Sequence, residues 1–202
     1  MTILSKERLR HLLFETDAAA DRLVVMPILE PDRQISEGSV DVRLGGYFVV
    51  TRSARVGGLE PFLDERTLNA YQETIHVPFG RQLWIHPGTF VLGVTLEYLR
   101  LPSTVFGSVT TRSSWARLGL HIASAVAVHP GFVGCLTLEL VNAGNTPVAM
   151  YPGARIGQLV FYDAPGGQPA GRGKYFGQIL PRFARLTEEA PELERWSALS
   201  LP

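Results

Sequence analysis

The sequence contains a single cysteine, Cys135. One cysteine cannot form an internal disulfide, and it cannot supply the paired thiolate ligands on which many zinc sites depend. We therefore expect a protein without a disulfide framework and without protein-bound zinc or another resident metal. A reducing compartment, the cytoplasm, suits such a chain best.

An excess of charge and long apolar runs are also missing. The 19 Lys and Arg residues are balanced by 19 Asp and Glu residues, so no overall basic field attracts nucleic acid or an acidic membrane. No segment approaches the roughly 18 apolar residues of a membrane-spanning helix, and the N-terminal stretch lacks an apolar core of signal-peptide length. We expect a protein that binds neither nucleic acid nor membrane, so that any phosphate binding must come from a local cluster.

What the sequence does contain is enough apolar material for one core, since 46% of its 202 residues are hydrophobic. Leu9, Leu12 and Leu13 recur at helical spacing behind a possible N-cap at Ser5, which predicts one short amphipathic helix over 5–14. Downstream, short runs rich in Val, Ile, Thr, Phe and Tyr alternate with Gly and Pro. Strands are predicted within 39–51, 76–102, 104–114, 134–144 and 154–162.

Strands of this length with frequent turns favour a mainly β fold, a barrel or a jelly-roll-like double sheet, over alternating βαβ units. We expect a single domain with its body over 5–163. The Gly- and Pro-rich stretch that begins at residue 164 is predicted to be mobile, so that the segment reaching residue 185 can act as a lid. Residues 186–202 are predicted to form a polar tail or a short docking helix, and 59–71 a loop with a short helix.

The densest polar segment is 110–117, which carries two arginines, Arg112 and Arg117, and four hydroxyl residues that include Ser113 and Ser114. Arginine offers a fixed fork of donors, and nearby hydroxyls add further donors to phosphate oxygens, so the cluster suits an oligophosphate. The alternative interpretation is an ordinary solvated surface turn.

Glu139 lies in the apolar run GCLTLELV. Strand alternation places Leu136, Leu138 and Leu140 in the core and Glu139 on the other face. A carboxylate enclosed by a largely apolar sheet tends to stay protonated, which suits a group that must take and return a proton. The alternative is a strand glutamate that faces solvent or pairs with an arginine.

Six segments occur in an order that is more specific than any one of them: EGSVDVRLG (37–45), HPGTFVLGVTLEYLRLP (86–102), RSSWARLGL (112–120), HPGFVGCLTLELVNAG (129–144), PGARIGQL (152–159) and GKYFGQ (173–178). Together they resemble the dCTP deaminase family over about residues 5–185. The resemblance implies the dUTPase-like trimeric fold, a distorted jelly roll or β-barrel, with active sites at the interfaces of a homotrimer.

The resemblance also implies deamination without zinc. Glu139 takes the position of the catalytic glutamate, which activates water for attack on C4 of cytosine and then protonates the departing amine. Ser113 matches a hydroxyl that helps to place this water, and Arg117 matches an arginine that supports the reacting centre.

The same resemblance suggests substrate contacts. Arg112 and Ser114 match phosphate-contacting residues that are supplied across a subunit boundary. Lys174 and Gln178 match the C-terminal segment that closes over the nucleotide, with the lysine toward phosphate and the glutamine toward the base.

Two further positions complete the expected site. The backbone around Ala125 matches a stretch that edges the base, and Thr137 is also expected to bind substrate. A magnesium ion is expected to accompany the substrate triphosphate. Asp41 and Arg43, which alternate with apolar residues in SVDVRLG, are expected to support the core or subunit contacts.

The sequence departs from the family pattern at three positions. His129 stands where the family normally has an aspartate that contacts the deoxyribose 3'-hydroxyl, Ala127 where some members have an arginine, and Gly167 where a tyrosine is expected. A neutral histidine can still hydrogen-bond a hydroxyl, whereas a protonated one can only donate.

The leading hypothesis is metal-free deamination of dCTP to dUTP and ammonia. One alternative is a deaminase of a different nucleotide, such as a monophosphate, a ribonucleotide or a modified base. Further alternatives are a bifunctional deaminase and dUTP diphosphatase, which the loss of the aspartate at 129 disfavours, and a non-catalytic binder that senses a nucleotide.

Overall fold

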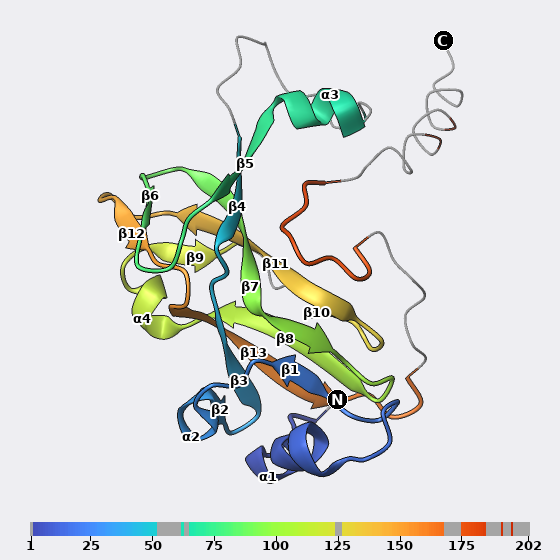
Figure 1. Ribbon diagram of the computed structural model, residues 1–202. Helices are drawn as coiled ribbons and strands as arrows, with labels where there is room; N and C mark the ends of the chain where they lie inside the picture. The colour runs from blue at the N-terminus through green and yellow to red at the C-terminus, as the bar shows by residue number, and fades with distance from the viewer. Residues whose placement is uncertain are drawn as a thin grey trace.

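The computed structural model describes residues 2–51, 62, 65–123, 127–167, 175–184, 191 and 195 (Figure 1). The helical elements are α1 (Lys6–Arg10), the π-helical turn η1 (His11–Glu15), α2 (Pro31–Gln34), α3 (Glu65–Ala70) and α4 (Ser113–Ala116). The strands are β1 (Val24–Met26), β2 (Ile35–Ser36), β3 (Ser39–Arg43), β4 (Tyr47–Thr51), β5 (Gln72–His76), β6 (Leu83–Ile85), β7 (Phe90–Arg100), β8 (Val105–Thr111), β9 (Leu120–Ile122), β10 (Ala127–Val128), β11 (Val133–Asn142), β12 (Val148–Met150) and β13 (Arg155–Asp163). The mainly β prediction is confirmed.

The predicted N-terminal helix is present at the start of the chain. Ser5 caps it, since its side-chain oxygen accepts a hydrogen bond from the Arg8 backbone N–H at 3.2 Å. Leu9, Leu12 and Leu13 are buried, so the face that their spacing indicated is the one that packs on the body. None of the described helices is long and apolar enough to cross a membrane.

Two antiparallel sheets make up the body in the part of the chain that the structure describes (Figure 1). The larger sheet has the order β5-β4-β7-β11-β9, with β1 also paired to β7. The second sheet has the order β10-β8-β13-β3-β2, and β12 pairs with β6 separately. Consecutive strands often lie in different sheets, which is the arrangement expected of a double-sheet β fold rather than of βαβ units.

One apolar core joins the sheets. Phe48 on β4 and Leu138 on β11 are fully buried in the larger sheet, and Leu159 and Phe161 on β13 are fully buried in the second. All five segments predicted to contain strands do contain them. Of the predicted loop with a short helix, α3 is described and residues 59–61, 63 and 64 lie outside the described residues, as do most of the predicted lid loop and tail.

Asp41 and Arg43 both lie on β3 and are buried, as expected of residues that support the core. The Arg43 guanidinium lies 3.2 Å from the carboxylate of Glu97 on β7, which is itself fully buried. Burial raises the pKa of the Glu97 carboxyl group above its ordinary value, although its hydrogen bonds with Arg43 oppose the shift. This ion pair therefore ties the two sheets together inside the core.

Candidate functional site

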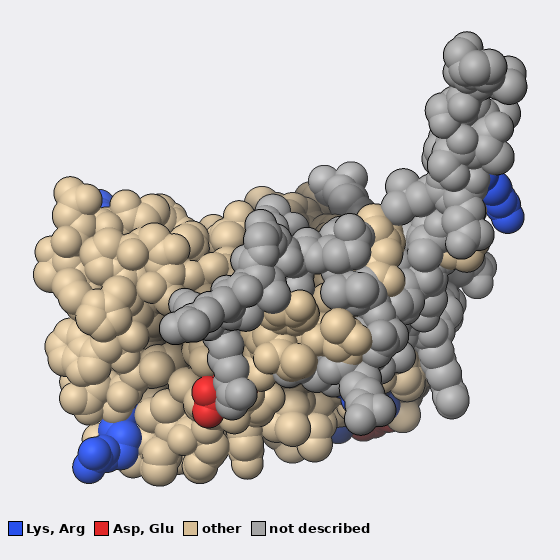
Figure 2. Space-filling view, turned by 90° about the horizontal axis from the view of Figure 1, so that it is seen from above, with Lys and Arg blue, Asp and Glu red and all other residues tan. Residues whose placement is uncertain are grey.

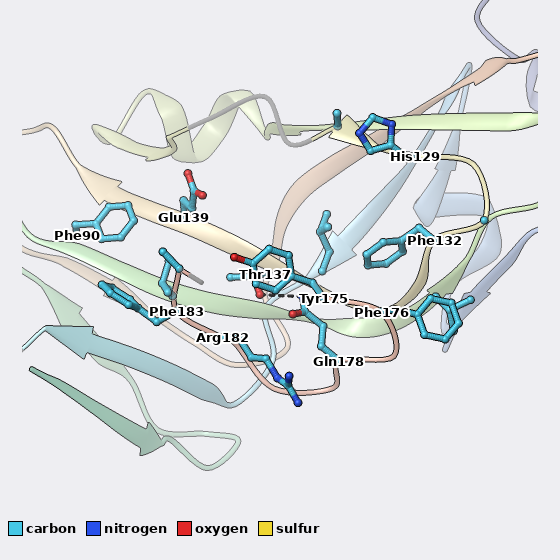
Figure 3. A pocket seen from close by; sticks show the side chains of 16 residues that line it. Phe90, His129, Phe132, Thr137, Glu139, Tyr175, Phe176, Gln178, Arg182 and Phe183 are labelled. Atoms are coloured by element: carbon cyan, nitrogen blue, oxygen red, sulfur yellow. Dashed lines mark hydrogen bonds between the residues drawn. The ribbon is translucent and has the colours of Figure 1, made fainter. Parts of the chain in front are cut away.

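A cavity of about 420 Å³ opens between strands β7 and β11 of the larger sheet, the turn that follows β10 and the segment 175–184 (Figure 3). Five aromatic residues form much of its wall: Phe90, Phe132, Tyr175, Phe176 and Phe183. Five further residues bring polar side chains, each of a different chemical kind: His129, Thr137, Glu139, Gln178 and Arg182. A mostly apolar cavity with a few placed polar groups is the usual form of a small-molecule site.

Strand β11 supplies the carboxylate. Its inward residues Leu136, Leu138 and Leu140 are buried, and Thr137 and Glu139 alternate with them on the face that lines the cavity. The backbone at Glu139 is fixed, because its carbonyl accepts a hydrogen bond of 2.6 Å from the Ala123 N–H just after β9. The prediction that Glu139 lies opposite the leucines of its strand is confirmed.

Gln178 is held against the edge of β11. Its backbone carbonyl accepts from the Cys135 N–H at 2.7 Å, and the Gly177 N–H donates to the Val133 carbonyl at 2.7 Å. A side chain at Gly134 could not be accommodated, since a Cβ there would lie 2.6 Å from the Gln178 carbonyl oxygen. Close approach of the C-terminal segment to the strand therefore requires this glycine.

Gln178 is 5% exposed, and the orientation of its side-chain amide follows from its hydrogen-bond partners. Its amide nitrogen donates to the Cys135 carbonyl at 3.1 Å and to Thr137 Oγ1 at 3.0 Å, the second bond being drawn in Figure 3. The Cys135 carbonyl can only accept, so the nitrogen must face it and Oε1 must face the other way. Oε1 is buried and has no hydrogen-bond partner among the described residues. A buried acceptor without a partner costs free energy, which a ligand N–H or O–H would recover.

The turn after β10 places His129 and Phe132 at the cavity. Pro130 and Gly131 occupy its central positions, Gly131 has φ of +81°, and the Phe132 N–H donates to the His129 carbonyl at 3.1 Å. Proline followed by a glycine of positive φ is the sequence that a type II turn requires. The exposed His129 ring packs edge-on against Phe106, with ring centroids 5.8 Å apart and planes at 73°.

The predicted phosphate cluster lies elsewhere on the chain. Arg112, Ser113, Ser114 and Arg117 surround the short helix α4, and none of them lines the cavity that holds Glu139. Ser113, Ser114 and Arg117 are exposed, while Arg112 is half-buried. A single chain therefore does not bring the two halves of the predicted site together.

Arg112 is anchored at its position by Asp41. Arg112 Nε lies 3.2 Å from Asp41 Oδ2, and Arg155 Nη1 lies 3.4 Å from the same oxygen. Arg112 Nη1 also donates to the Arg155 carbonyl at 3.3 Å. Burial raises the pKa of Asp41 above its ordinary value, against the opposing charges of these arginines.

Two predicted residues, Ala125 and Lys174, lie outside the described residues. Sequence reasoning missed the aromatic wall, although Phe132 follows the HPG turn and Tyr175 and Phe176 belong to the motif GKYFGQ. Nothing in the sequence pointed to Arg182, whose side chain extends away from Thr137 in Figure 3. The described residues contain no group of three or more His, Cys, Asp and Glu side chains placed to hold a metal ion.

Charge is sparse on the face seen from above in Figure 2. Among its described residues, Lys, Arg, Asp and Glu side chains appear singly toward the rim and form no broad basic patch.

Comparison with known proteins gives consistent matches. Residues 3–164 match a family model described as dCTP deaminase-like. A "dCTP deaminase, dUMP-forming" of Methanothermobacter thermautotrophicus is 37% identical over 196 residues, which cover 94% of this chain and 96% of the relative. A "dCTP deaminase" of Natronomonas pharaonis is 38% identical over 190 residues, which cover 91% of this chain and 94% of the relative.

Among solved structures, the chain is similar to 2'-deoxycytidine 5'-triphosphate deaminase from Agrobacterium tumefaciens, with a TM-score of 0.58 and 24% sequence identity. The match covers 79% of this chain and 48% of that one, so the chain spans about half the length of this structural relative. At this identity the likeness establishes the fold.

Proposed function

Because this chain belongs to the dCTP deaminase-like family, we propose that it catalyses the hydrolytic deamination of dCTP to dUTP and ammonia. Relatives 37–38% identical over nearly their whole length are named dCTP deaminases, which supports the substrate and the reaction. The family resemblance drawn from the six sequence segments is confirmed. The observation that carries the proposal is the cavity in which Glu139, Thr137 and Gln178 line one wall.

In this mechanism Glu139 works as general base and then as general acid. It accepts a proton from water as the water oxygen bonds to C4 of cytosine, and it returns the proton to the 4-amino nitrogen. The C4–N bond then breaks and ammonia leaves, while the proton of the C4 hydroxyl group passes to N3, so that C4 keeps the oxygen as the carbonyl of uracil. A half-buried carboxylate in a largely apolar cavity can contact both the attacking water and the departing amine, which suits both steps.

Gln178 is proposed to recognise the base. Its buried Oε1 is an acceptor that lacks a partner among the described residues, and the 4-amino group of cytosine is a donor. The uracil product presents a carbonyl at the same position and cannot satisfy Oε1. The glutamine therefore favours substrate over product, and Thr137, which holds the glutamine amide, supports this contact.

The phosphate end of the site is proposed to come from a second copy of the chain. Ser113, Ser114 and Arg117 are exposed and, with Arg112, lie outside the cavity, so a neighbouring subunit of a homotrimer can present them to the nucleotide held by its partner. Ser113 and Arg117 then act at the reacting centre, while Arg112 and Ser114 contact phosphate.

Three further elements of the proposal concern the closed complex. The C-terminal segment over 164–185 closes over the nucleotide, with Lys174 toward the phosphates, and the backbone near Ala125 edges the base. The described part of this segment already pairs with β11 through Gln178, which supports the direction of closure. A magnesium ion would be carried by the triphosphate, whose oxygens suit this hard cation.

His129 favours a second candidate, a deaminase whose preferred nucleotide differs from dCTP in its sugar or phosphates. Its imidazole lies at the cavity where the family aspartate is expected to contact the 3'-hydroxyl. Onward hydrolysis to dUMP, the product in the names of several relatives, needs a base near the α-phosphate, and this position offers an imidazole instead of a carboxylate.

The test is to incubate the purified protein with dCTP, dCMP, CTP and dUTP in the presence of magnesium, and to measure ammonia and pyrophosphate separately. We expect ammonia from dCTP without stoichiometric pyrophosphate. Faster ammonia release from dCMP or CTP would replace dCTP by that nucleotide, and pyrophosphate from dUTP would establish the bifunctional enzyme. Tight nucleotide binding without either product would indicate a sensor.

A further inference from the structure

The pairing of β7 with β11 is interrupted beside the candidate site. The register passes from Cys135 opposite Tyr98 to Thr137 opposite Val94, so residues 95–97 of β7 face Leu136 alone. Extra residues on one strand of an antiparallel pair form a β-bulge, which bends the strand and changes the direction of nearby side chains. Thr137 is the first β11 residue after the interruption, and Glu139 follows two residues later.

The hydroxyl of Thr95 fills the gap that the bulge leaves. Its Oγ1 accepts a hydrogen bond from the Leu136 backbone N–H at 2.9 Å and donates to the Glu97 carbonyl at 2.8 Å. Thr95 is 2% exposed, so water cannot easily replace either bond. The Thr95 hydroxyl oxygen therefore accepts the kind of hydrogen bond that a backbone carbonyl of the neighbouring strand accepts elsewhere in the sheet.

This bond lies on the opposite edge of β11 from the backbone clamp, by which we mean the hydrogen bond from the Cys135 N–H to the Gln178 carbonyl. Successive backbone N–H groups of a strand point to opposite edges, and the Cys135 N–H donates to the Gln178 carbonyl at 2.7 Å while the Leu136 N–H donates to Thr95. β11 is thus held from both edges at adjacent residues. Thr137, the next residue, receives the Gln178 side-chain amide.

The bulge itself rests on a buried polar group. Glu97 Oε2 accepts from the Arg43 backbone N–H at 2.7 Å, and Glu97 Oε1 accepts from Arg43 Nη1 and from Gln34 Nε2, each at 3.2 Å. Gln34 also donates to the Asp41 carbonyl at 3.0 Å. Because these partners are buried and satisfied, the bulge has little freedom to move and can serve as a fixed support.

We propose that Thr95 is a positioning residue for the reaction. Its hydroxyl fixes β11 at Leu136, so that Thr137, Gln178 and Glu139 keep their places in the cavity. Without it, the buried Leu136 N–H would lose its partner and the strand would shift toward another acceptor. A displacement of about 1 Å at a reacting group can lower a rate roughly 100-fold. This role of Thr95 rests on the proposed function of Glu139.

The test compares Thr95→Val, which keeps the shape and removes the hydroxyl, with Thr95→Ser, which restores it. The matched control is Ser39→Ala, because Ser39 is also buried and its Oγ accepts a hydrogen bond, from Gln158 at 2.9 Å in the second sheet. For each full-length variant, kcat and KM for ammonia release from dCTP are measured well below its Tm.

We expect Thr95→Val to lower kcat by about 10- to 100-fold. The kcat of Thr95→Ser should stay within about threefold of the parental value. Ser39→Ala should keep the parental kcat even where its Tm falls as far as that of Thr95→Val. A Thr95→Val variant with the parental kcat and only a lower Tm would show a purely structural threonine. If the valine variant does not fold, Thr95→Ala carries the same comparison, since it adds no methyl group against the Leu136 N–H.

Glu139→Gln separates the two proposals. If Glu139→Gln keeps the parental rate, the proposed function of the cavity fails. If it is inactive while the folded Thr95 variants keep full kcat, only the positioning role of Thr95 fails.

Discussion

Replacing Gln178 with alanine should weaken catalysis while leaving the backbone clamp in place. The Cys135 N–H donates to the main-chain carbonyl of residue 178, so this bond survives the substitution, whereas Gln178 Oε1 and the two bonds of its amide nitrogen are lost. The perturbation therefore removes the proposed contact to the base without detaching the segment from β11.

The expected size follows from one lost ligand hydrogen bond at a buried site. Leaving the donor of a bound base without its acceptor costs about 1–3 kcal/mol, which corresponds to a fall of about 5- to 150-fold in kcat/KM. The loss of stability should be smaller than two hydrogen bonds imply, because the substitution also removes the unpartnered Oε1 from the interior.

The assay is steady-state ammonia release from dCTP, with circular dichroism to confirm folding. Gln72→Ala is the matched control, because the Gln72 amide donates to the Leu68 carbonyl at 3.2 Å and lies outside the cavity. We expect the control to keep its kcat/KM. A folded Gln178→Ala variant whose kcat/KM stays within twofold of the parent would refute base recognition by Gln178.

Three further predictions concern the core, the sugar and the subunit interface. Burial raises the pKa of Glu97, so the folded chain holds this proton to a higher pH than the unfolded chain, and the associated stability is lost as pH rises through the folded pKa. The free energy of unfolding of the parent minus that of Glu97→Gln, from urea denaturation, should therefore fall as pH rises above the ordinary glutamate pKa of about 4.5; a rise in this difference contradicts the burial effect. His129→Asp should raise the ratio of kcat/KM for dCTP to kcat/KM for its 2',3'-dideoxy analogue by about tenfold, since a hydrogen bond to a charged group contributes about 1.5 kcal/mol or more. An unchanged ratio would show that residue 129 does not contact the sugar. Arg117→Ala and Glu139→Gln should each be inactive alone and regain activity when co-expressed, because mixed assemblies contain sites with both parental residues; inactive mixtures would argue against a site shared between subunits.

Local patterns in the sequence were sufficient to predict strand β11 and the direction of Glu139. Leucines at every second position can only be buried together if the intervening residues face away, and the structure has Leu136, Leu138 and Leu140 buried with Glu139 at the cavity. The short helix behind Ser5 was predictable for the same reason, since a cap and an apolar face are both encoded within ten residues.

Long-range geometry could not be predicted in this way. The bond between Thr95 and Leu136 depends on the register of two strands, and that register is interrupted by residues that carry no local signal of a bulge. The anchoring of Arg112 by Asp41 likewise joins residues far apart in the chain. Motif order identified Gln178, but only the fold shows that its Oε1 is buried without a partner among the described residues.

The position of the α4 cluster relative to the cavity comes from the structure. Sequence resemblance implied that Arg112 and Ser114 reach the site of Glu139 across a subunit boundary, and within a single chain they lie outside the cavity that holds Glu139. Subunit contacts are a property of assembled surfaces and leave no periodic pattern in the chain.

The central claim is that Glu139 performs proton transfer during deamination of dCTP, and the most direct measurement is ammonia release by Glu139→Gln. Glutamine keeps the size of the side chain and removes its capacity to take a proton, while Glu7→Gln, on the exposed face of α1, is the matched control. We expect Glu139→Gln to bind dCTP, by isothermal titration, with an affinity close to that of the parent and to release ammonia about 1,000-fold more slowly, within the roughly 10²- to 10⁴-fold contribution of general acid–base catalysis. A Glu139→Gln variant that turns over dCTP at the parental rate would contradict the account.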